Sequence, residues 1–312
     1  MPTKAEKERE ERINARRLEA KKKTEEKAAK AKKLKDRLGK SKEVTLNARA
    51  NMLKGGVIVE VINVVQARLA QATGFTAVCP LDFTIKDLEA RKMSRLVDPR
   101  VTQAIANSVL IPTVAKISIG HYIEADVAIE VGSNFVDECE YAVAAVAGAT
   151  VFIKNKGAQP VPFICGVTSL ADCLRRLKEG AKILRIKQTA AVRVDATLAT
   201  LKKLLAEVIK YQDEKARKLW LRSSVLEEAD FDRIRGAKDL SCLPLYGYGG
   251  ISTPRDVALM MDMKCTGVFV DNTVFTSDNP RNRLKAIVAA VSSFDDMDKM
   301  IDLSIGTGER FV

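Results

Sequence analysis

The chain has 312 residues, of which 46% are hydrophobic and 29% are charged, and its formal net charge is +12. This length and composition indicate a globular protein with a full hydrophobic core, built as one large barrel or two modest domains. The most apolar window, residues 141–153, is too short to span a bilayer and no signal-peptide pattern is present, so we expect no membrane partner.

Cysteine and histidine usage argues against disulfide and metal chemistry. The single histidine, His121, and six cysteines without a C-x-x-C pair form no cluster with zinc-ligand spacing, and we expect neither a metal nor another cofactor. Cysteines scattered through apolar runs are typical of core residues in a reducing compartment. We therefore predict a cytoplasmic protein with free thiols at Cys79, Cys139, Cys165, Cys173, Cys242 and Cys265.

Residues 1–42 differ in composition from the rest of the chain. They contain 17 Lys and Arg against 8 Asp and Glu, which gives this segment a net charge of +9. Because its large aliphatic side chains are too few for a core, we expect a basic helical or disordered arm, separate from a domain of residues 43–312. The charge favours attachment to a polyanion such as RNA or an acidic protein surface, with a solubilising tail as the alternative. A mitochondrial transit peptide is disfavoured because such segments avoid acidic residues.

From residue 54 onward, short apolar runs alternate with helix-like stretches. The runs predicted as strands are Val57 to Val61, Thr76 to Leu81, Thr113 to Ile117, Phe135 to Glu138, Pro162 to Gly166, Lys182 to Lys187, Leu243 to Tyr248 and Gly267 to Asp271. The helix-like stretches include Val64 to Thr73, Asp98 to Ser108, His121 to Val131, Ser169 to Glu179, Asp195 to Tyr211, Pro254 to Met263 and Asn279 to Val291.

Eight near-continuous apolar strands separated by helices are typical of a parallel sheet that is covered on its outside. At this length the pattern predicts an α/β fold of the (β/α)₈ TIM-barrel class. A doubly wound open sheet is the alternative, but no G-x-G-x-x-G motif follows the first strand. The long interval of residues 188–242 requires an extra helical excursion between the sixth and seventh strands.

The strand-like run IPTVAKISIGH carries Lys116 near its C-terminal end. Burial on a strand disfavours the ammonium form of a lysine, so the neutral amine becomes available as a nucleophile toward carbonyl groups. The alternative is a lysine that simply pairs with a carboxylate at the end of a strand.

In a parallel barrel, residues at the C-terminal ends of the strands meet on one face. Two lysines and several carboxylates around one cavity suit imine formation, in which an amine attacks a sugar carbonyl and a carboxylate moves protons. Charge-paired residues without chemistry would give a similar sequence. The residues expected to converge are Glu60, Lys116, Asp137, Glu138, Glu140, Arg185 and Lys187, with the loops after the last two strands.

Between residues 53 and 291 the chain carries, in order, the runs LKGGVIVEVINVVQARLAQATGFTAV, IPTVAKISIGH, VDECE, VPFICG, LRRLKEGAKILRIK, LPLYGYGGISTPRDVALMM and GVFVDNTVFTSDNP. Together they resemble the synthase subunit of pyridoxal 5′-phosphate synthase, the glutaminase-dependent vitamin B6 enzyme. The resemblance implies a (β/α)₈ barrel that assembles into two stacked hexameric rings. It also implies synthesis of pyridoxal phosphate from ribose 5-phosphate, glyceraldehyde 3-phosphate and ammonia, which a glutaminase partner supplies.

The resemblance assigns catalytic roles to individual residues. It makes Lys116 the lysine that forms the first imine, or Schiff base, with the pentose phosphate, and Lys187 the second lysine, which takes over the intermediate. Asp137 and Glu140 match acidic residues near the first lysine. Glu60 stands where the family has an aspartate, and Ser118 stands where it has an arginine.

Two phosphate-contacting segments depart from the family pattern. Where the family reads KGEPGTGN after its second lysine, this chain reads KQTAAVRV, so Cβ atoms block the close backbone approach to a phosphate. After the eighth strand the family's GSG becomes DNT, which places a carboxylate where a phosphate dianion should sit; one like-charge pair at about 4 Å costs about 4 kcal/mol at an effective dielectric constant of about 20. The predicted substrate- and phosphate-binding residues are Gly249, Gly250, Asp271, Asn272, Thr273, Arg185 and Glu140.

These departures lead to three hypotheses. The favoured one is a pseudoenzyme, a structural or regulatory subunit in which Lys116, Lys187, Glu60 and Asp137 are vestigial catalytic residues. The second is an active pyridoxal 5′-phosphate synthase subunit, and the third is a barrel that acts on another phosphosugar or aldehyde. The partners expected are further copies of the chain or an active paralogue, a glutaminase subunit, and a polyanion bound by residues 1–42.

Overall fold

The computed structural model describes residues 40–82, 97–139, 161–187 and 193–307. The chain divides into two compact units, Met1–Leu46 and Asn47–Val312. Residues 40–51 are helical, and the rest of the predicted arm lies outside the described residues. Within the ranges described, none of the helices combines the length and the apolar character that a bilayer crossing requires.

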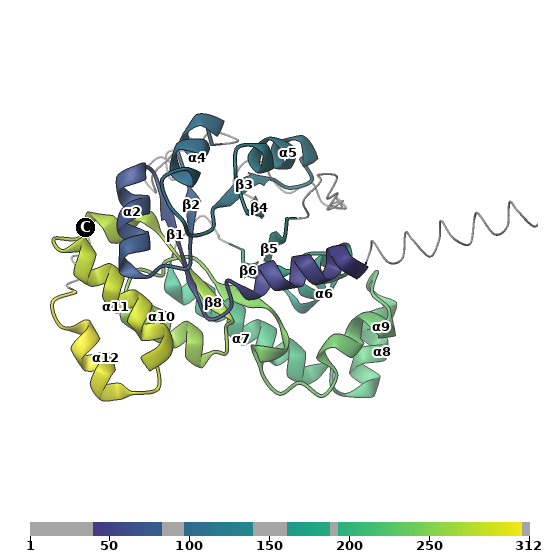
Figure 1. The fold of residues 1–312 in the computed structure, drawn as a ribbon. Helices are drawn as coiled ribbons and strands as arrows, with labels where there is room; N and C mark the ends of the chain where they lie inside the picture. The colour runs from purple at the N-terminus through teal and green to yellow at the C-terminus, as the bar shows by residue number, and fades with distance from the viewer. Residues whose placement is uncertain (1–39, 83–96, 140–160, 188–192, 308–312) are drawn as a thin grey trace, which may run out of the picture. The chain divides into compact units, whose positions relative to one another are not determined.

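All eight predicted strands are present, in a single parallel sheet (Figure 1). They are β1 (Val57–Val61), β2 (Ala77–Pro80), β3 (Val114–Ser118), β4 (Phe135–Cys139), β5 (Phe163–Val167), β6 (Ile183–Ile186), β7 (Leu245–Gly247) and β8 (Gly267–Val270). The sheet order β2-β1-β8-β7-β6-β5-β4-β3 leaves one seam, between β2 and β3, which a parallel bridge from Val78 to Thr113 closes. The prediction of a (β/α)₈ barrel is therefore confirmed.

Helices follow the strands along the chain, as predicted. Those that cover the barrel are α2 (Val64–Thr73), α4 (Pro99–Ala106), α5 (Tyr122–Glu130), α6 (Leu170–Glu179), α7 (Val194–Lys210), α10 (Pro254–Asp262) and α11 (Pro280–Ser293). Local sequence sets their ends: the Thr253 side chain and the Asp256 side chain form a reciprocal capping box at the start of α10, and Gly74 ends α2 at a φ of 95°. A further helix, α12 (Met297–Ser304), was not predicted; it begins at Asp296, whose side chain accepts a hydrogen bond from the Lys299 amide.

Side chains alternate between the inside of the barrel and the layer under the helices. The interior is filled by Ile58, Ala77, Cys79, Val114, Phe135, Ile164, Ile183, Tyr246 and Phe269, each from a different strand except the pair on β2. The residues between them on the strands, such as Val59, Leu184 and Val268, join the larger cluster beneath the helices. Because strand side chains have a period of two, an apolar run on each strand supplies both layers.

All six cysteines are free, and five of them are buried. Burial raises the pKa of the Cys242 thiol to about 11 and that of the Cys265 thiol to about 12. It likewise holds the pKa values of Cys79 and Cys173 well above their usual range. The five buried cysteines are therefore core residues, as the sequence indicated.

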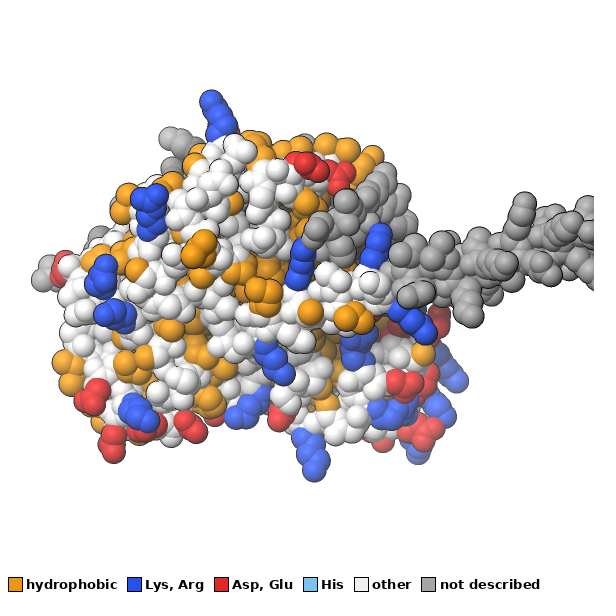
Figure 2. Space-filling model, in the orientation of Figure 1, with side chains coloured by type: hydrophobic (Ala, Val, Ile, Leu, Met, Phe, Trp, Pro, Cys, Tyr) orange, Lys and Arg blue, Asp and Glu red, His pale blue; other side chains and the backbone are white. Residues whose placement is uncertain are grey.

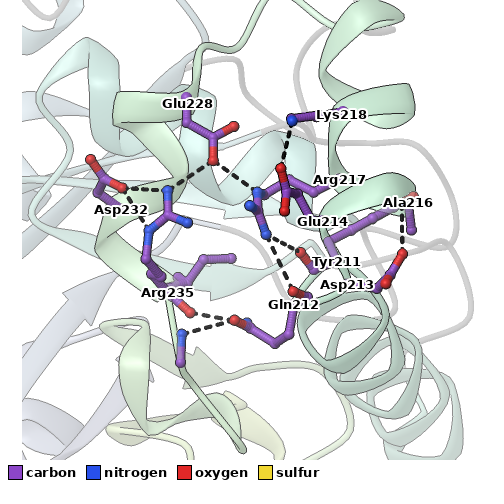
Figure 3. Close-up of polar contacts among 12 residues, drawn as sticks. Tyr211, Gln212, Asp213, Glu214, Ala216, Arg217, Lys218, Glu228, Asp232 and Arg235 are labelled. Atoms are coloured by element: carbon purple, nitrogen blue, oxygen red, sulfur yellow. Dashed lines mark hydrogen bonds and ion pairs between the residues drawn. The ribbon is translucent and has the colours of Figure 1, made fainter.

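The predicted excursion between β6 and β7 consists of the end of α7, α8 (Glu214–Arg222) and α9 (Glu228–Phe231) (Figure 3). Arg217, with 7% of its surface exposed, lies at the centre of this excursion. Its Nε donates to Glu228 at 2.9 Å, and its Nη1 donates to the carbonyl oxygens of Tyr211 at 3.4 Å and Gln212 at 3.2 Å. Acidic and basic side chains gather over α8 and α9 on the face that Figure 2 shows.

Replacing Arg217 with alanine should lower the free energy of unfolding by about 2–3 kcal/mol, because one buried cation serves three acceptors and its stem packs against neighbouring side chains. The matched control is Lys218→Ala on the same helix. Lys218 pairs with Glu214, but both side chains are more than half exposed, so its loss should cost less than about 0.5 kcal/mol. Urea denaturation measures both values, and equal losses would contradict the central role of Arg217.

Candidate active site

A layer of polar side chains lies inside the barrel, one step beyond the apolar interior. Each member follows an interior residue of its strand by two positions, because the alternation continues to the strand's C-terminal end. Every member has at most 6% of its surface exposed. This polar layer consists of Glu60, Lys116, Asp137, Arg185, Tyr248 and Asp271.

Lys116 on β3 and Glu60 on β1 form an ion pair across the barrel, with 2.5 Å between Lys116 Nζ and Glu60 Oε1. The hydroxyl group of Tyr248, which follows β7, contacts both of these atoms. The pair stabilises the ammonium form of Lys116, so the amine must release a proton before it can attack a carbonyl group. Glu60 is positioned to accept that proton, and Tyr248 is positioned to relay one.

Arg185 on β6 and Asp137 on β4 form a second ion pair, and both side chains are fully buried. Arg185 Nε lies 2.8 and 2.9 Å from the two carboxylate oxygens, and its guanidinium nitrogens also donate to the carbonyl oxygens of Ile186 and Glu138. The guanidinium carbon is 5.1 Å from the centre of the Tyr248 ring. This pair therefore holds the ring of Tyr248, and through it the hydroxyl group at Lys116, in position.

Asp271 lies directly after β8 and accepts a hydrogen bond from the Gly250 amide at 3.1 Å. Only 2% of its surface is exposed, and its Oδ1 has no hydrogen-bond partner among the described residues. Burial raises the pKa of Asp271 well above its ordinary value, and the nearby Glu60 raises it further, while Lys116 opposes both effects. Asp271 therefore keeps its proton to a higher pH than an ordinary aspartate does.

Tyr248 is the member of the polar layer that we did not single out from the sequence. It lies within the predicted seventh strand, two residues after the interior Tyr246, and that spacing was the available signal. Its loop is fixed by α7, because Thr197 Oγ1 donates to the carbonyl oxygens of Tyr248 and Gly249 at 2.8 and 2.9 Å.

One residue expected at the C-terminal face lies elsewhere. Glu138 is adjacent to Asp137 on β4, so the alternation turns it to the outer side of the sheet, where it contacts Arg176 of α6. The expectation that Glu138 would converge with Lys116 was therefore wrong. Ser118, at the end of β3, is 1% exposed, and its amide donates to Glu124 at 2.7 Å.

The remaining predicted residues flank the polar layer. Lys187 immediately follows β6 and is half-buried, and its amide donates to the carbonyl oxygen of Val167 at 2.9 Å. Asn272 and Thr273 begin the 3₁₀ helix η3 (Asn272–Thr276), and Asn272 is buried. Glu140, together with residues 188–192 after Lys187, lies outside the described residues.

Residues 42–249 match the model of the SOR/SNZ family. The chain is 37% identical over 268 residues to the pyridoxal 5′-phosphate synthase subunit PdxS of Salinispora tropica, covering 84% of this chain and 86% of that protein. It is 35% identical to the PdxS subunit of Methanothermobacter thermautotrophicus, covering 85% and 91%. It is also 35% identical to the probable pyridoxal 5′-phosphate synthase subunit PDX1 of Hevea brasiliensis, covering 84% and 85%.

The substitution Asp271→Asn should stabilise the protein at pH 8 by about 1–3 kcal/mol, because the amide carries no charge whose burial must be offset at that pH. An acid whose pKa is raised by folding contributes stability at low pH and loses it as the pH rises from the ordinary aspartate range through the folded pKa. The asparagine has no such loss, so the gain should shrink toward pH 4. Thermal unfolding between pH 4 and pH 8 measures the gain in stability, with the exposed Asp302→Asn as the control. A gain in stability that does not change with pH would contradict the raised pKa.

Proposed function

This chain belongs to the SOR/SNZ family, and we propose on that premise that it is an active pyridoxal 5′-phosphate synthase-like subunit whose chemistry begins at Lys116. The observation that carries the proposal is the contact of one buried amine with both a carboxylate and a phenol, from Glu60 and Tyr248. These are the groups that imine formation requires: a nucleophile, a proton acceptor and a proton relay.

The chemistry follows from the arrangement of the polar layer. Glu60 takes a proton from the Lys116 ammonium group, and the freed amine adds to the carbonyl carbon of a sugar to give a carbinolamine. Glu60 or Tyr248 then returns a proton to the carbinolamine hydroxyl group, which leaves as water while the nitrogen lone pair forms the C=N bond of a protonated imine. The buried ion pair of Arg185 and Asp137 keeps the Tyr248 ring oriented during these steps.

By resemblance, the carbonyl compounds are ribose 5-phosphate and glyceraldehyde 3-phosphate, and ammonia is the nitrogen source. Lys187, at the end of β6, is proposed as the second lysine that receives the intermediate. The relatives are named as subunits of an enzyme, which supports assembly with other copies of this chain, with an active paralogue or with a glutaminase. From the sequence we also propose that residues 1–42 bind a polyanion and that the protein is cytoplasmic.

A second function, as a non-catalytic structural or regulatory subunit, is favoured by one observation. The carboxyl group of Asp271 accepts the hydrogen bond of the Gly250 amide, in the loop that the resemblance assigns to phosphate binding. Two observations support the active subunit better than the pseudoenzyme that the changed phosphate loops favoured. They are the family relationship along 84% of the chain and the presence of a lysine, a carboxylate and a phenol in contact.

Borohydride reduction after incubation with ribose 5-phosphate tests the proposal. We expect a covalent sugar adduct by intact-protein mass spectrometry, and its complete loss in Lys116→Ala. Lys202→Ala, an exposed lysine on α7, serves as the matched control and should keep the adduct. Folded protein that gives no adduct with any aldose would support the non-catalytic subunit instead.

Glu60→Gln should slow adduct formation by about 10²–10⁴-fold without abolishing it, because the amide keeps the shape of the site but cannot accept the proton from Lys116. The rate is measured by quenching with borohydride at timed intervals. A rate within twofold of the unsubstituted protein would show that Glu60 is only a charge partner of the lysine.

A further inference from the structure

The turn between β3 and α5 directly follows the strand that carries Lys116. Ser118 ends β3 and His121 caps the start of α5, so only two residues separate the strand from the cap. The His121 amide donates to the carbonyl oxygen of Ser118 at 3.1 Å, and Gly120 between them adopts a φ of 77°. Because the turn is this tight, a shift of the first turn of α5 reaches the end of the strand.

The carboxyl group of Glu124 ties the helix to the strand. Glu124 is in the first turn of α5, and its Oε2 accepts a hydrogen bond from the amide of Ser118 at 2.7 Å. In the usual capping box, a glutamate at this position bonds to the amide of the cap residue itself, here His121. Glu124 instead reaches further back, onto the strand. Only 8% of its surface is exposed, so the Ser118 amide would not easily find water in place of this carboxylate.

Two further contacts hold the rest of the turn. The Glu124 amide donates to His121 Nδ1 at 3.2 Å, which fixes the cap of α5. The Gly120 amide donates to Glu138 Oε1 at 3.3 Å, and Glu138 also contacts Arg176 of α6. Glu138 and Arg176 are both buried. The outward-facing Glu138 therefore supports the turn from β4.

The C-terminal end of β3 depends on such support because the strand has a continuous ladder on one side only. It pairs with β4 along its whole length, from Val114 to Ser118. On the other side, the described residues join β2 to it through a single bridge at Thr113, just before the strand begins. Glu124 thus adds a tie at the end of β3 that is farthest from this bridge.

This tie acts on the strand that aims the reactive lysine. Ser118 follows Lys116 by two positions, so both side chains face the inside of the barrel. Lys116 Nζ can exchange a proton with Glu60 and Tyr248 only while it lies within hydrogen-bond distance of them. A displacement of about 1 Å at the reacting atoms can slow a reaction by about 10²-fold, so a shift of the strand end would be costly at the amine.

We propose that Glu124 is a positioning residue, which holds the end of β3 so that Lys116 stays aligned for imine formation. The inference rests on the imine chemistry of the proposed function. Glu124 belongs to a helix that covers the outside of the barrel, so it acts through Ser118 and not by touching the sugar. Its loss should therefore slow imine formation and leave sugar binding nearly unchanged.

The test follows the borohydride-trapped adduct of ribose 5-phosphate against time and sugar concentration in the full-length protein. In Glu124→Ala we expect the limiting rate to fall by about 10–100-fold, with the half-saturating sugar concentration changed by less than about threefold. Glu124→Asp, which keeps the charge but is one methylene group too short to reach Ser118, should be slowed similarly. In Glu124→Gln the amide oxygen can still accept this hydrogen bond, so the limiting rate should stay within about threefold of the unsubstituted protein.

Arg217→Ala is the structural control, because Arg217 stabilises α8 and α9, which carry no residue of the polar layer. It should destabilise the fold without slowing adduct formation. Equal slowing in Arg217→Ala and Glu124→Ala would show that the loss reflects general instability, and would overturn the inference. A limiting rate in Glu124→Ala within about twofold of the unsubstituted protein would also overturn it, and would leave the imine chemistry of Lys116 intact.

Absence of any adduct from the unsubstituted protein would instead defeat the proposed function, so a second measurement is independent of the imine. Amide hydrogen exchange at Ser118, read by fragmentation mass spectrometry, should be faster by about 10-fold or more in Glu124→Ala. Exchange at the unsubstituted rate would show that Glu124 does not hold the strand end, whatever Lys116 does.

Discussion

The ion pair between Lys116 and Glu60 joins β3 to β1 inside the barrel, and the arrangement of the site depends on it. Two charges at this depth are tolerated because each satisfies the other and because Tyr248 hydrogen-bonds to both. The second pair, Arg185 and Asp137, supports the Tyr248 ring from the neighbouring strand β6, which carries Arg185. The barrel thus holds the Lys116 amine between two polar partners, Glu60 and Tyr248.

Much of the fold was predictable because it depends on local pattern. The eight strands were identified from apolar runs, and the excursion before β7 from an interval too long for one connection. The short helix α12 was missed because it spans only eight residues and its main signal is the capping residue Asp296. Glu138 was predicted at the site because it lies near the C-terminal end of its strand. The alternation of side chains along the strand instead turns it to the outer side of the sheet.

The partners within the site could not be obtained in the same way. Sequence indicated that Lys116 would be buried and left open whether it pairs with a carboxylate; the structure pairs it with Glu60, a residue 56 positions away. The contribution of Tyr248 depends on the register between β7 and its neighbours, which no local pattern contains. The role of Asp271 likewise depends on the loop after β7, since a carboxylate that could repel a phosphate instead binds the Gly250 amide.

The seam of the barrel determines where the sheet opens most readily. Among the described residues, β2 and β3 are joined by the single bridge from Val78 to Thr113, to which the hydrogen bond from the Val78 amide to Pro112 belongs, whereas the other neighbouring strands share ladders of two or more residue pairs. Regions with few backbone hydrogen bonds open at the lowest free energy. Amide hydrogen exchange in the strands should therefore be fastest at this seam. The Lys116–Glu60 ion pair links β3 to β1 on the two sides of β2, and so opposes separation of the strands there.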